Sequence, residues 1–271
     1  MSECLWYPNY LKKVSINMKV YYQILLFGLL LLSIYSCSSK TDKQLLIYAA
    51  ASMTDSLNEI VTEYELRNPD VNINFNYGGS QALAAQLNQG APGDVFISAG
   101  YGPVGFLISS DKIHLKSISQ IASNKLVVVT RSSSKMPTAI EDIQNINRIA
   151  IADPDLAPAG SYAREALRNI GLWEDLTEKI VFAPDVRATL NYVRTGNVDA
   201  GIVYYTDALS VPELVKHDLI SQSSYGTILY PAVIIEGGDT IAEAEALIEF
   251  IMGDFSKTIL QKHGFILPSY E

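Results

Sequence analysis

Short apolar runs alternate with amphipathic stretches along most of the chain, and this pattern predicts strands and helices in turn. A run of strand length at 45–48 precedes apolar positions at helical spacing, which are Leu57, Ile60, Val61 and Tyr64. The alternation recurs with expected strands at 71–77, 94–98, 126–130, 148–152, 179–182 and 200–204, and with expected helices ending near 90 and covering 161–170 and 186–193. Repeated alternation of this kind indicates mostly parallel sheets with helices on both faces.

The alternation falls into two series, which predict two α/β lobes. Residues 45–122 and 231–271 are expected to form lobe 1, and residues 123–230 lobe 2. The last two apolar-periodic stretches, about 240–252 and 255–263, are too little for a third domain, so we expect them to pack back on lobe 1. Two lobes joined by chain crossings, here near 120–126 and 226–232, are typical of binding proteins that close around a ligand.

A cluster of small residues separates the first strand from the first helix. Ser52 stands at this turn, and Asp55 three residues later resembles a capping box, with Thr54 as a competing cap. The free N–H groups at a helix start at the carboxyl end of a strand can bind an anion. A serine here is more often a simple cap, so the turn alone does not predict a site.

The same kind of turn recurs three more times, and the four turns together predict a binding site. Ser80 follows the second strand, Ala159 lies in the turn after the strand at 148–152, and Val186 follows the strand at 179–182. Tyr204 ends a further strand and offers a phenol donor. The five positions supply hydrogen-bond donors and no acceptor, which suits a small, fully deprotonated, doubly charged oxyanion.

Charge and composition narrow the partners. With 20 basic and 29 acidic residues, the net charge of −9 makes nucleic-acid binding a poor hypothesis, because that binding depends on Lys and Arg. Any anion must then be bound by local geometry, not by the field of the whole protein. Cys4 and Cys37 lie in the N-terminal segment, and the three histidines match no metal-ligand spacing, so we expect no cofactor and no bare-cation site.

The N-terminal segment resembles an export signal. Met18 and Lys19 precede an apolar run at 24–32 that ends near Cys37, and the residues before this cysteine resemble a bacterial lipobox. We therefore expect residues 1–37 to be an extension and lipoprotein signal, with translation starting at Met18, Cys37 as the lipidated residue and 38–44 as a tether. A permanent membrane anchor is the alternative, although the run is short for a span.

Five motifs together resemble the periplasmic molybdate-binding proteins of ABC importers, in order and spacing, over essentially the whole chain after residue 44. They are AAASMTDSL, GGSQALAAQLNQGAPGDVFISA, DPDLAPAGSYAREAL, DVRATL and GIVYYTDA. The resemblance implies a two-lobed type II periplasmic binding protein with molybdate or tungstate in the interlobe cleft. It places the ligand contacts on Ser52, Ser80, Ala159, Val186 and Tyr204.

The resemblance also implies a monomeric, non-enzymatic receptor outside the cytoplasm. It would sit at the membrane surface through its lipid anchor and deliver its small oxyanion to an ABC permease.

Two other functions stay open at this stage. The same fold could bind sulfate or another tetrahedral oxyanion, and sulfate is the harder rival because it is also an acceptor-only dianion. A secreted serine hydrolase using Ser52 or Ser80 is the alternative from another class. No G-x-S-x-G elbow is present and no histidine lies in the motif turns, so the sequence argues against it.

Overall fold

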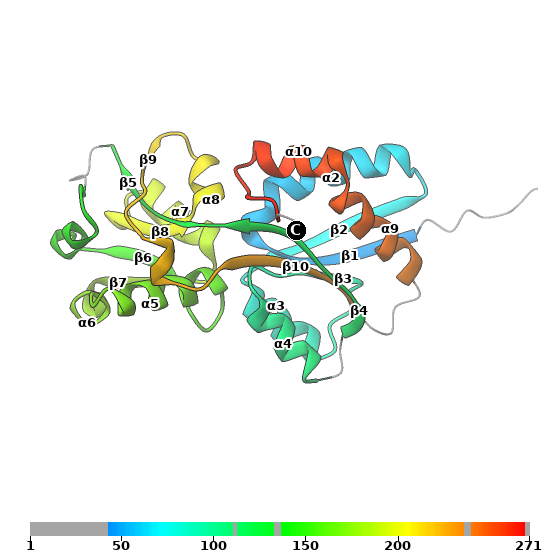
Figure 1. Ribbon diagram of the computed structural model, residues 1–271, viewed down its shortest axis with the longest axis horizontal. Coiled ribbons are helices and arrows are strands. Elements are labelled where there is room, and N and C mark those ends of the chain that lie inside the picture. The colour runs from blue at the N-terminus through cyan, green and yellow to red at the C-terminus, as the bar shows by residue number, and fades with distance from the viewer. Residues whose placement is uncertain (1–42, 111–112, 133–136, 236–239, 269–271) are drawn as a thin grey trace, which may run out of the picture. The chain divides into compact units, whose positions relative to one another are not determined.

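The computed structural model describes residues 43–110, 113–132, 137–235 and 240–268 (Figure 1). The predicted signal segment, its Cys37 and most of the tether lie outside the described residues. The described chain is organised around two five-stranded sheets, each flanked by helices. We call each sheet with its helices a lobe.

The sheet of lobe 1 is mostly parallel, as expected. Its strands, in sheet order, are β2 (Val71–Gly78), β1 (Lys43–Ala50), β3 (Val95–Ile97), β10 (Ile228–Ile235) and β4 (Ile113–Asn124). Only β10 is antiparallel to its neighbours, so the other four strands share one direction. The register of β10 against β4 shifts between Tyr230 and Pro231, where the proline has no N–H for the ladder.

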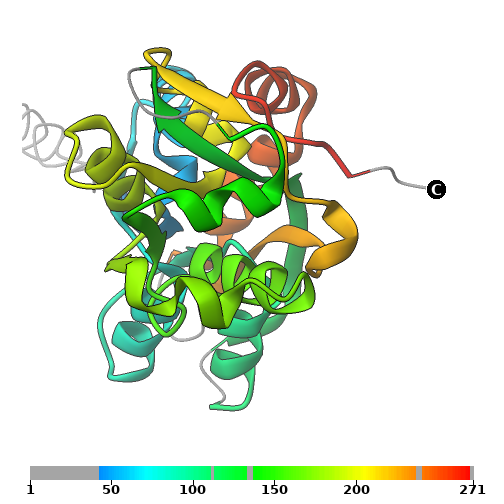
Figure 2. The same cartoon turned by 90° about the vertical axis from the view of Figure 1, so that its left-hand side faces the viewer.

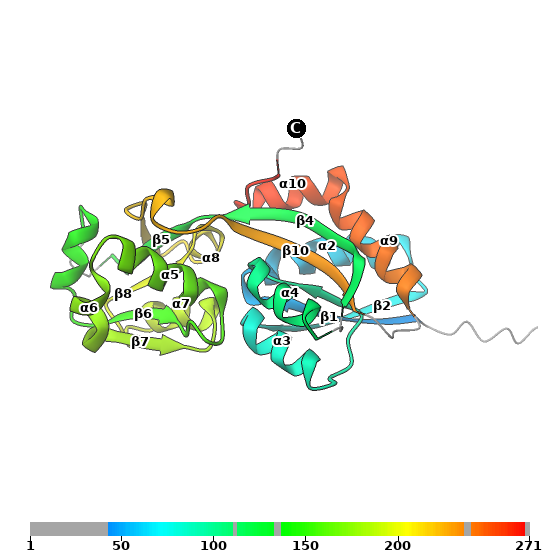
Figure 3. The ribbon, with the colours of Figure 1, turned by 60° about the horizontal axis from the view of Figure 1, so that its bottom comes forward.

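Both faces of this sheet are covered, which explains the nearly continuous apolar run of β1. Ile47 packs in the larger core with α2 (Thr54–Arg67), while its neighbour Tyr48 belongs to a second cluster with Leu83 and Phe96. One face carries α2, α9 (Ile241–Met252) and α10 (Asp254–Lys262), and the other carries α3 (Ser80–Asn88) and α4 (Tyr101–Ile108), as Figure 3 shows. Helix α9 contacts β4, β10 and α2, and α10 contacts α2 and α9.

The sheet of lobe 2 repeats this plan. Its strands, in sheet order, are β7 (Ile180–Ala183), β6 (Ile149–Ala152), β8 (Ala200–Tyr204), β5 (Leu126–Arg131) and β9 (Leu214–His217). Strands β5 and β9, at one edge of the sheet, lie side by side in Figure 2.

The helices of lobe 2 are α5 (Pro158–Asn169), α6 (Trp173–Leu176), α7 (Val186–Arg194) and α8 (Tyr205–Leu209), with short 3₁₀ turns η2 (Ile140–Asn145), η3 (Thr177–Lys179) and η4 (Gln222–Ser224). The connection from β6 through α5 to β7 moves across the sheet in one direction, and the connection from β7 through α7 to β8 moves in the other. Since such connections are right-handed, α5 and α7 lie on opposite faces of the sheet.

Three strands, β4, β9 and β10, are missing from the sequence-based prediction. In β4 the alternation of apolar and polar residues is irregular, and its pairing with β10 contains register shifts, so a period of two does not persist. Lys125 alone separates β4 in lobe 1 from β5 in lobe 2, and β10 brings the chain back. The lobe boundaries given above stay a prediction.

Candidate functional site

The register of the parallel strands brings the helix starts together in pairs. In lobe 1, Ala50 at the end of β1 is the partner of Gly78 at the end of β2. The 3₁₀ turn η1 (Ala51–Met53) and helix α3 therefore begin side by side. In lobe 2, Ala152 and Ala183 end β6 and β7 as register partners, so α5 and α7 also begin side by side. Four chain segments with unpaired N–H groups result, two in each lobe.

The predicted contact residues occupy the first turns of these segments. Ser80 and Val186 are the first residues of α3 and α7, and Ala159 is the second residue of α5. Helix α5 begins at Pro158, earlier than the sequence predicted, because proline is well suited to the first helical position. The backbone N–H groups of all three residues lie in a first turn, where a helix offers no partner.

The structure brings all five predicted residues to one pocket between the lobes. The pocket is small, with an empty volume of about 200 Å³ that includes space open to solvent. Lobe 1 and lobe 2 both contribute to its lining, which comprises Ala50, Ala51, Ser52, Gly78, Gly79, Ser80, Ala99, Ala157, Pro158, Ala159, Asp185, Val186 and Tyr204. A pocket of this size and composition fits a small ion.

Two hydroxyl groups in the pocket keep a proton to donate. Ser80 Oγ accepts a hydrogen bond from Ala99 N–H at 3.1 Å, so its own proton is left for another acceptor. Tyr204 Oη is buried and has no hydrogen-bond partner among the described residues. Burial raises the pKa of Tyr204 well above its usual value, so the phenol stays protonated. An unsatisfied buried donor costs about 1–3 kcal/mol, and an anion in the pocket would remove that cost.

Ser52 is placed as predicted, but its surroundings differ from the expected capping box. Neither Asp55 nor Ser52 caps α2; Thr54 Oγ1 donates to Ala51 O at 2.7 Å, within the preceding 3₁₀ turn. That turn continues directly into α2, so no side-chain cap forms. Ser52 Oγ instead lies 2.9 Å from Tyr230 Oη of β10. Sequence reasoning did not identify Tyr230, because an aromatic residue within an apolar strand normally indicates only core packing.

The pocket contains no basic side chain among its lining residues. Asp185 is the charged residue in the lining, and its Oδ1 accepts from Ala188 N–H at 2.8 Å as the N-cap of α7. Arg187, next to Val186, takes part in ion pairs instead. An anion would therefore be held by neutral donors and by the positive ends of helices.

One of the ion pairs of Arg187 connects the lobes, and the other lies within lobe 2. Arg187 Nη2 donates to Asp55 Oδ2 of lobe 1 at 2.7 Å, and Arg187 Nε lies 2.6 Å from Asp207 Oδ1 of α8, without hydrogen-bond alignment. Asp207 is fully buried. Burial raises the pKa of Asp207 to about 7, although the Arg187 charge acts in the opposite direction. Sequence patterns did not reveal this group, because Asp207 reads as an ordinary helix residue.

Other contacts hold the lobes close together at the pocket. Ala82 N–H of α3 donates to Leu156 O of lobe 2 at 3.1 Å, and Gln81 Nε2 donates to Pro154 O at 3.2 Å. A Cβ atom at Gly79 would lie 2.3 Å from Leu156 O, so this approach requires glycine at that position. The pocket walls are thus joined by direct hydrogen bonds.

Within the described ranges, no group of three or more His, Cys, Asp or Glu residues could hold a metal ion. In the same part of the chain, none of the helices combines the length and apolar character that crossing a membrane requires.

Comparisons with known proteins agree with this geometry. The model of the bacterial extracellular solute-binding protein family matches residues 45–266. The putative ABC transporter substrate-binding lipoprotein YvgL of Bacillus subtilis (strain 168) is 36% identical over 85% of this chain and 90% of its own length. The molybdate-binding protein ModA of Haemophilus influenzae is 30% identical over 81% of this chain and 88% of its own length.

A solved structure is also similar. It is the substrate-binding domain of a putative molybdenum ABC transporter from Clostridium difficile, with 30% sequence identity and a TM-score of 0.65, covering 83% of this chain and 99% of that one.

Proposed function

Because the chain belongs to the family of bacterial extracellular solute-binding proteins, we propose that it captures molybdate or tungstate and delivers the anion to an ABC permease. In this proposal Ser52, Ser80 and Tyr204 donate through their hydroxyl groups. Ala159 and Val186 donate through their backbone N–H groups. No cofactor takes part, and the metal enters only as the centre of the bound oxyanion.

The single observation that carries the proposal is that the five predicted contact residues, each with a hydroxyl or first-turn N–H donor, line one pocket. Tyr204 has a buried hydroxyl with no partner in the described part of the chain, and Ser80 accepts from Ala99 N–H, which leaves the Ser80 proton to donate. Each hydrogen bond to a charged group contributes about 1.5–3 kcal/mol, so five such bonds exceed an association cost of at least ~4 kcal/mol. An acceptor-only dianion satisfies every one of these donors.

The relatives favour molybdate over sulfate, which is the alternative ligand of the same class. One relative at 30% identity is named a molybdate-binding protein, and a solved structure at 30% identity comes from a putative molybdenum transporter. Sulfate offers the same charge and shape at a smaller size, so the preference depends on how closely the two lobes approach.

The serine hydrolase alternative finds no support in the pocket. Ser52 pairs with a phenol and Ser80 with a backbone N–H, so neither contacts a general base. We therefore propose a binding protein that performs no chemistry.

Calorimetric titration tests the ligand assignment. We expect tight binding of molybdate and tungstate by residues 38–271, and much weaker binding of sulfate, because relatives at 30% identity are named for molybdate or molybdenum. Tight sulfate binding without a molybdate response would contradict the assignment. A protein that binds none of the three would contradict the proposed function as a whole.

The membrane attachment belongs to the same proposal. One relative is named a lipoprotein, and Cys37 lies at the end of the signal-like segment. We expect the mature chain to begin at an acylated Cys37 and to act as a monomer outside the cytoplasm. Mass spectrometry of the N-terminal peptide from membrane fractions checks this, and an unmodified chain that still carries the apolar run at 24–32 would contradict it.

A further inference from the structure

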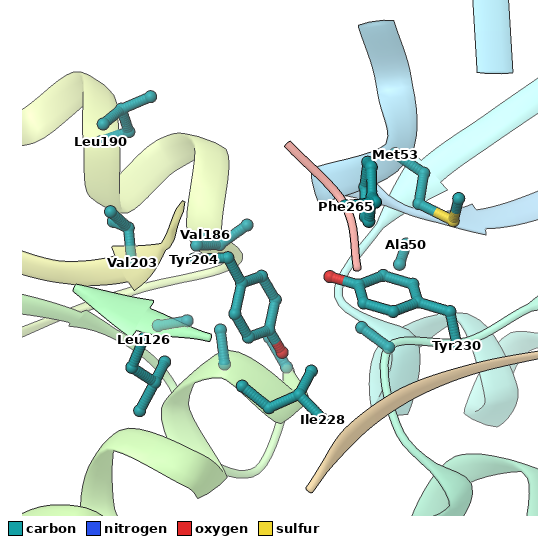
Figure 4. Packing of buried hydrophobic residues seen from close by; sticks show 14 of the residues in the cluster. Ala50, Met53, Leu126, Val186, Leu190, Val203, Tyr204, Ile228, Tyr230 and Phe265 are labelled. Atoms are coloured by element: carbon teal, nitrogen blue, oxygen red, sulfur yellow. The ribbon is translucent and has the colours of Figure 1, made fainter. Parts of the chain in front are cut away.

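A row of hydrogen bonds runs from lobe 2 through the two crossing strands to Ser52. Asn124 Nδ2, on β4, donates to Thr206 Oγ1 of α8 at 2.9 Å and to Tyr230 Oη of β10 at 3.1 Å. Tyr230 Oη lies 2.9 Å from Ser52 Oγ. All four residues are buried. Figure 4 shows Tyr230 beside Tyr204, whose ring is 6.2 Å away between centroids. Since Ser52 lines the pocket, the row of hydrogen bonds ends at the pocket wall.

The direction of each bond follows from the atoms that can donate. Asn124 Oδ1 accepts from Lys125 N–H at 2.9 Å, which identifies the other amide atom as Nδ2, a donor only. Tyr230 Oη accepts from this nitrogen, so the Tyr230 proton cannot point there. Burial raises the pKa of Tyr230 far above its usual value, so the hydroxyl keeps its proton. Within the described part of the chain, Ser52 Oγ is the acceptor that remains for this proton.

We propose that Tyr230, held by Asn124, is a positioning residue that directs the proton of the Ser52 hydroxyl toward the bound anion. The inference rests on the proposed function and deepens it. Ser52 accepts from Tyr230, so its own proton is directed to the pocket. Ser80 is set in the same way by Ala99 N–H. Each serine thus has one lone pair engaged by the protein and its proton left for the ligand, which favours an oxyanion that only accepts over one that carries a proton.

Removing the Tyr230 hydroxyl should relax this selection. In Tyr230→Phe, the lone pairs of Ser52 become available, and its proton can turn away from the pocket. Arsenate is the probe for a protonated ligand, since it is tetrahedral and carries one proton as the dianion at pH 8. We expect the affinity for molybdate to fall about three- to tenfold. The ratio of the arsenate Kd to the molybdate Kd should fall about tenfold, because a factor of ten corresponds to roughly one hydrogen bond.

Tyr225→Phe is the matched control. Tyr225 Oη is buried and accepts from Leu126 N–H at 3.0 Å, close to the same crossing strands, but it does not contact Ser52. This variant should keep the parent ratio. Tyr230 acts through Ser52, so Tyr230→Phe added to Ser52→Ala should change neither affinity further. A merely structural role for Tyr230 would lower both affinities in either background.

The possible outcomes separate the two proposals. If the parent protein binds molybdate and Tyr230→Phe keeps its ratio, only the role of Tyr230 is overturned. If the parent binds no tetrahedral oxyanion, the proposed function fails and this inference fails with it. Should Tyr230→Phe not fold, neutron diffraction from crystals of the parent with molybdate decides the matter. A deuteron bonded to Tyr230 between the two oxygens supports the inference, and one bonded to Ser52 in that position overturns it.

Discussion

Molybdate affinity is expected to fall by a factor of about 10²–10⁴ when Ser52→Ala and Ser80→Ala are combined. Each substitution removes one hydrogen bond to a charged ligand, worth about 1.5–3 kcal/mol, and a tenfold change in Kd corresponds to about 1.4 kcal/mol. Each single variant should therefore lose about 10–150-fold. Tyr204→Phe should lose as much as one serine, since its hydroxyl has no other partner among the described residues.

Calorimetric titration of the parent, the single variants and the double variant measures these losses. Ser56→Ala is the matched control, because Ser56 is also buried and close in the chain, but its hydroxyl donates to Met53 O at 3.1 Å and does not line the pocket. The control should bind like the parent. The site would be misplaced if the double variant and Tyr204→Phe also bound like the parent while remaining folded.

The position of the pocket could be predicted because it depends on strand ends. Ser52, Ser80, Ala159 and Val186 each follow a parallel strand, and neighbouring parallel strands end at the same edge of a sheet. Apolar runs and small residues mark such ends in the sequence. The helix starts were therefore expected within one or two residues, and α5 deviates only because Pro158 can begin a helix.

The contacts behind the pocket could not be predicted in the same way. Tyr230 and Asn124 lie on the crossing strands β10 and β4, and the pairing of these strands contains register shifts that hide their periodicity. Ser52 was expected to cap the first helix or to bind the anion, yet its hydroxyl meets Tyr230, which is 178 residues away. Such a contact depends on how the crossing strands pass the first helix, and no local pattern encodes that.

The pocket combines a rigid donor set with a buried ion pair next to it. Val186 lines the pocket, and the next residue, Arg187, reaches away to Asp55 and Asp207. The helix start thus faces the ligand site without bringing the Arg187 charge into it. Selectivity then depends on geometry, and the cation serves to hold α7 against α8 and lobe 1.

Arg187→Met is expected to lower the free energy of unfolding by about 3–5 kcal/mol at pH 8.5, because it leaves the fully buried Asp207 without its cation. The folded-state pKa of Asp207 is about 7 even with Arg187 present, above the unfolded value of 3.8, so its contribution to stability falls as pH rises between these values. Without Arg187 this pKa rises further, and the decline extends above pH 7. At pH 6 the Asp207 carboxyl is protonated in the folded state of both proteins. The loss of stability should therefore be smaller at pH 6 than at pH 8.5 by about 2 kcal/mol, because each pH unit above the parent pKa of about 7 corresponds to 1.36 kcal/mol.

Urea unfolding at pH 6 and pH 8.5 measures both effects, and Asp207→Asn provides the decisive partner variant. Adding Asp207→Asn to Arg187→Met removes the buried charge, so the double variant should regain about 2 kcal/mol of the stability lost at pH 8.5, which is the part that depends on pH. Asp55→Asn is the matched control for the other end of Arg187. The Asp55 side chain is 43% exposed, so water screens this pair and its loss should cost at most about 1 kcal/mol. Equal losses at both pH values, or a double variant no more stable than Arg187→Met, would show that Arg187 stabilises the fold by packing and not by compensating the Asp207 charge.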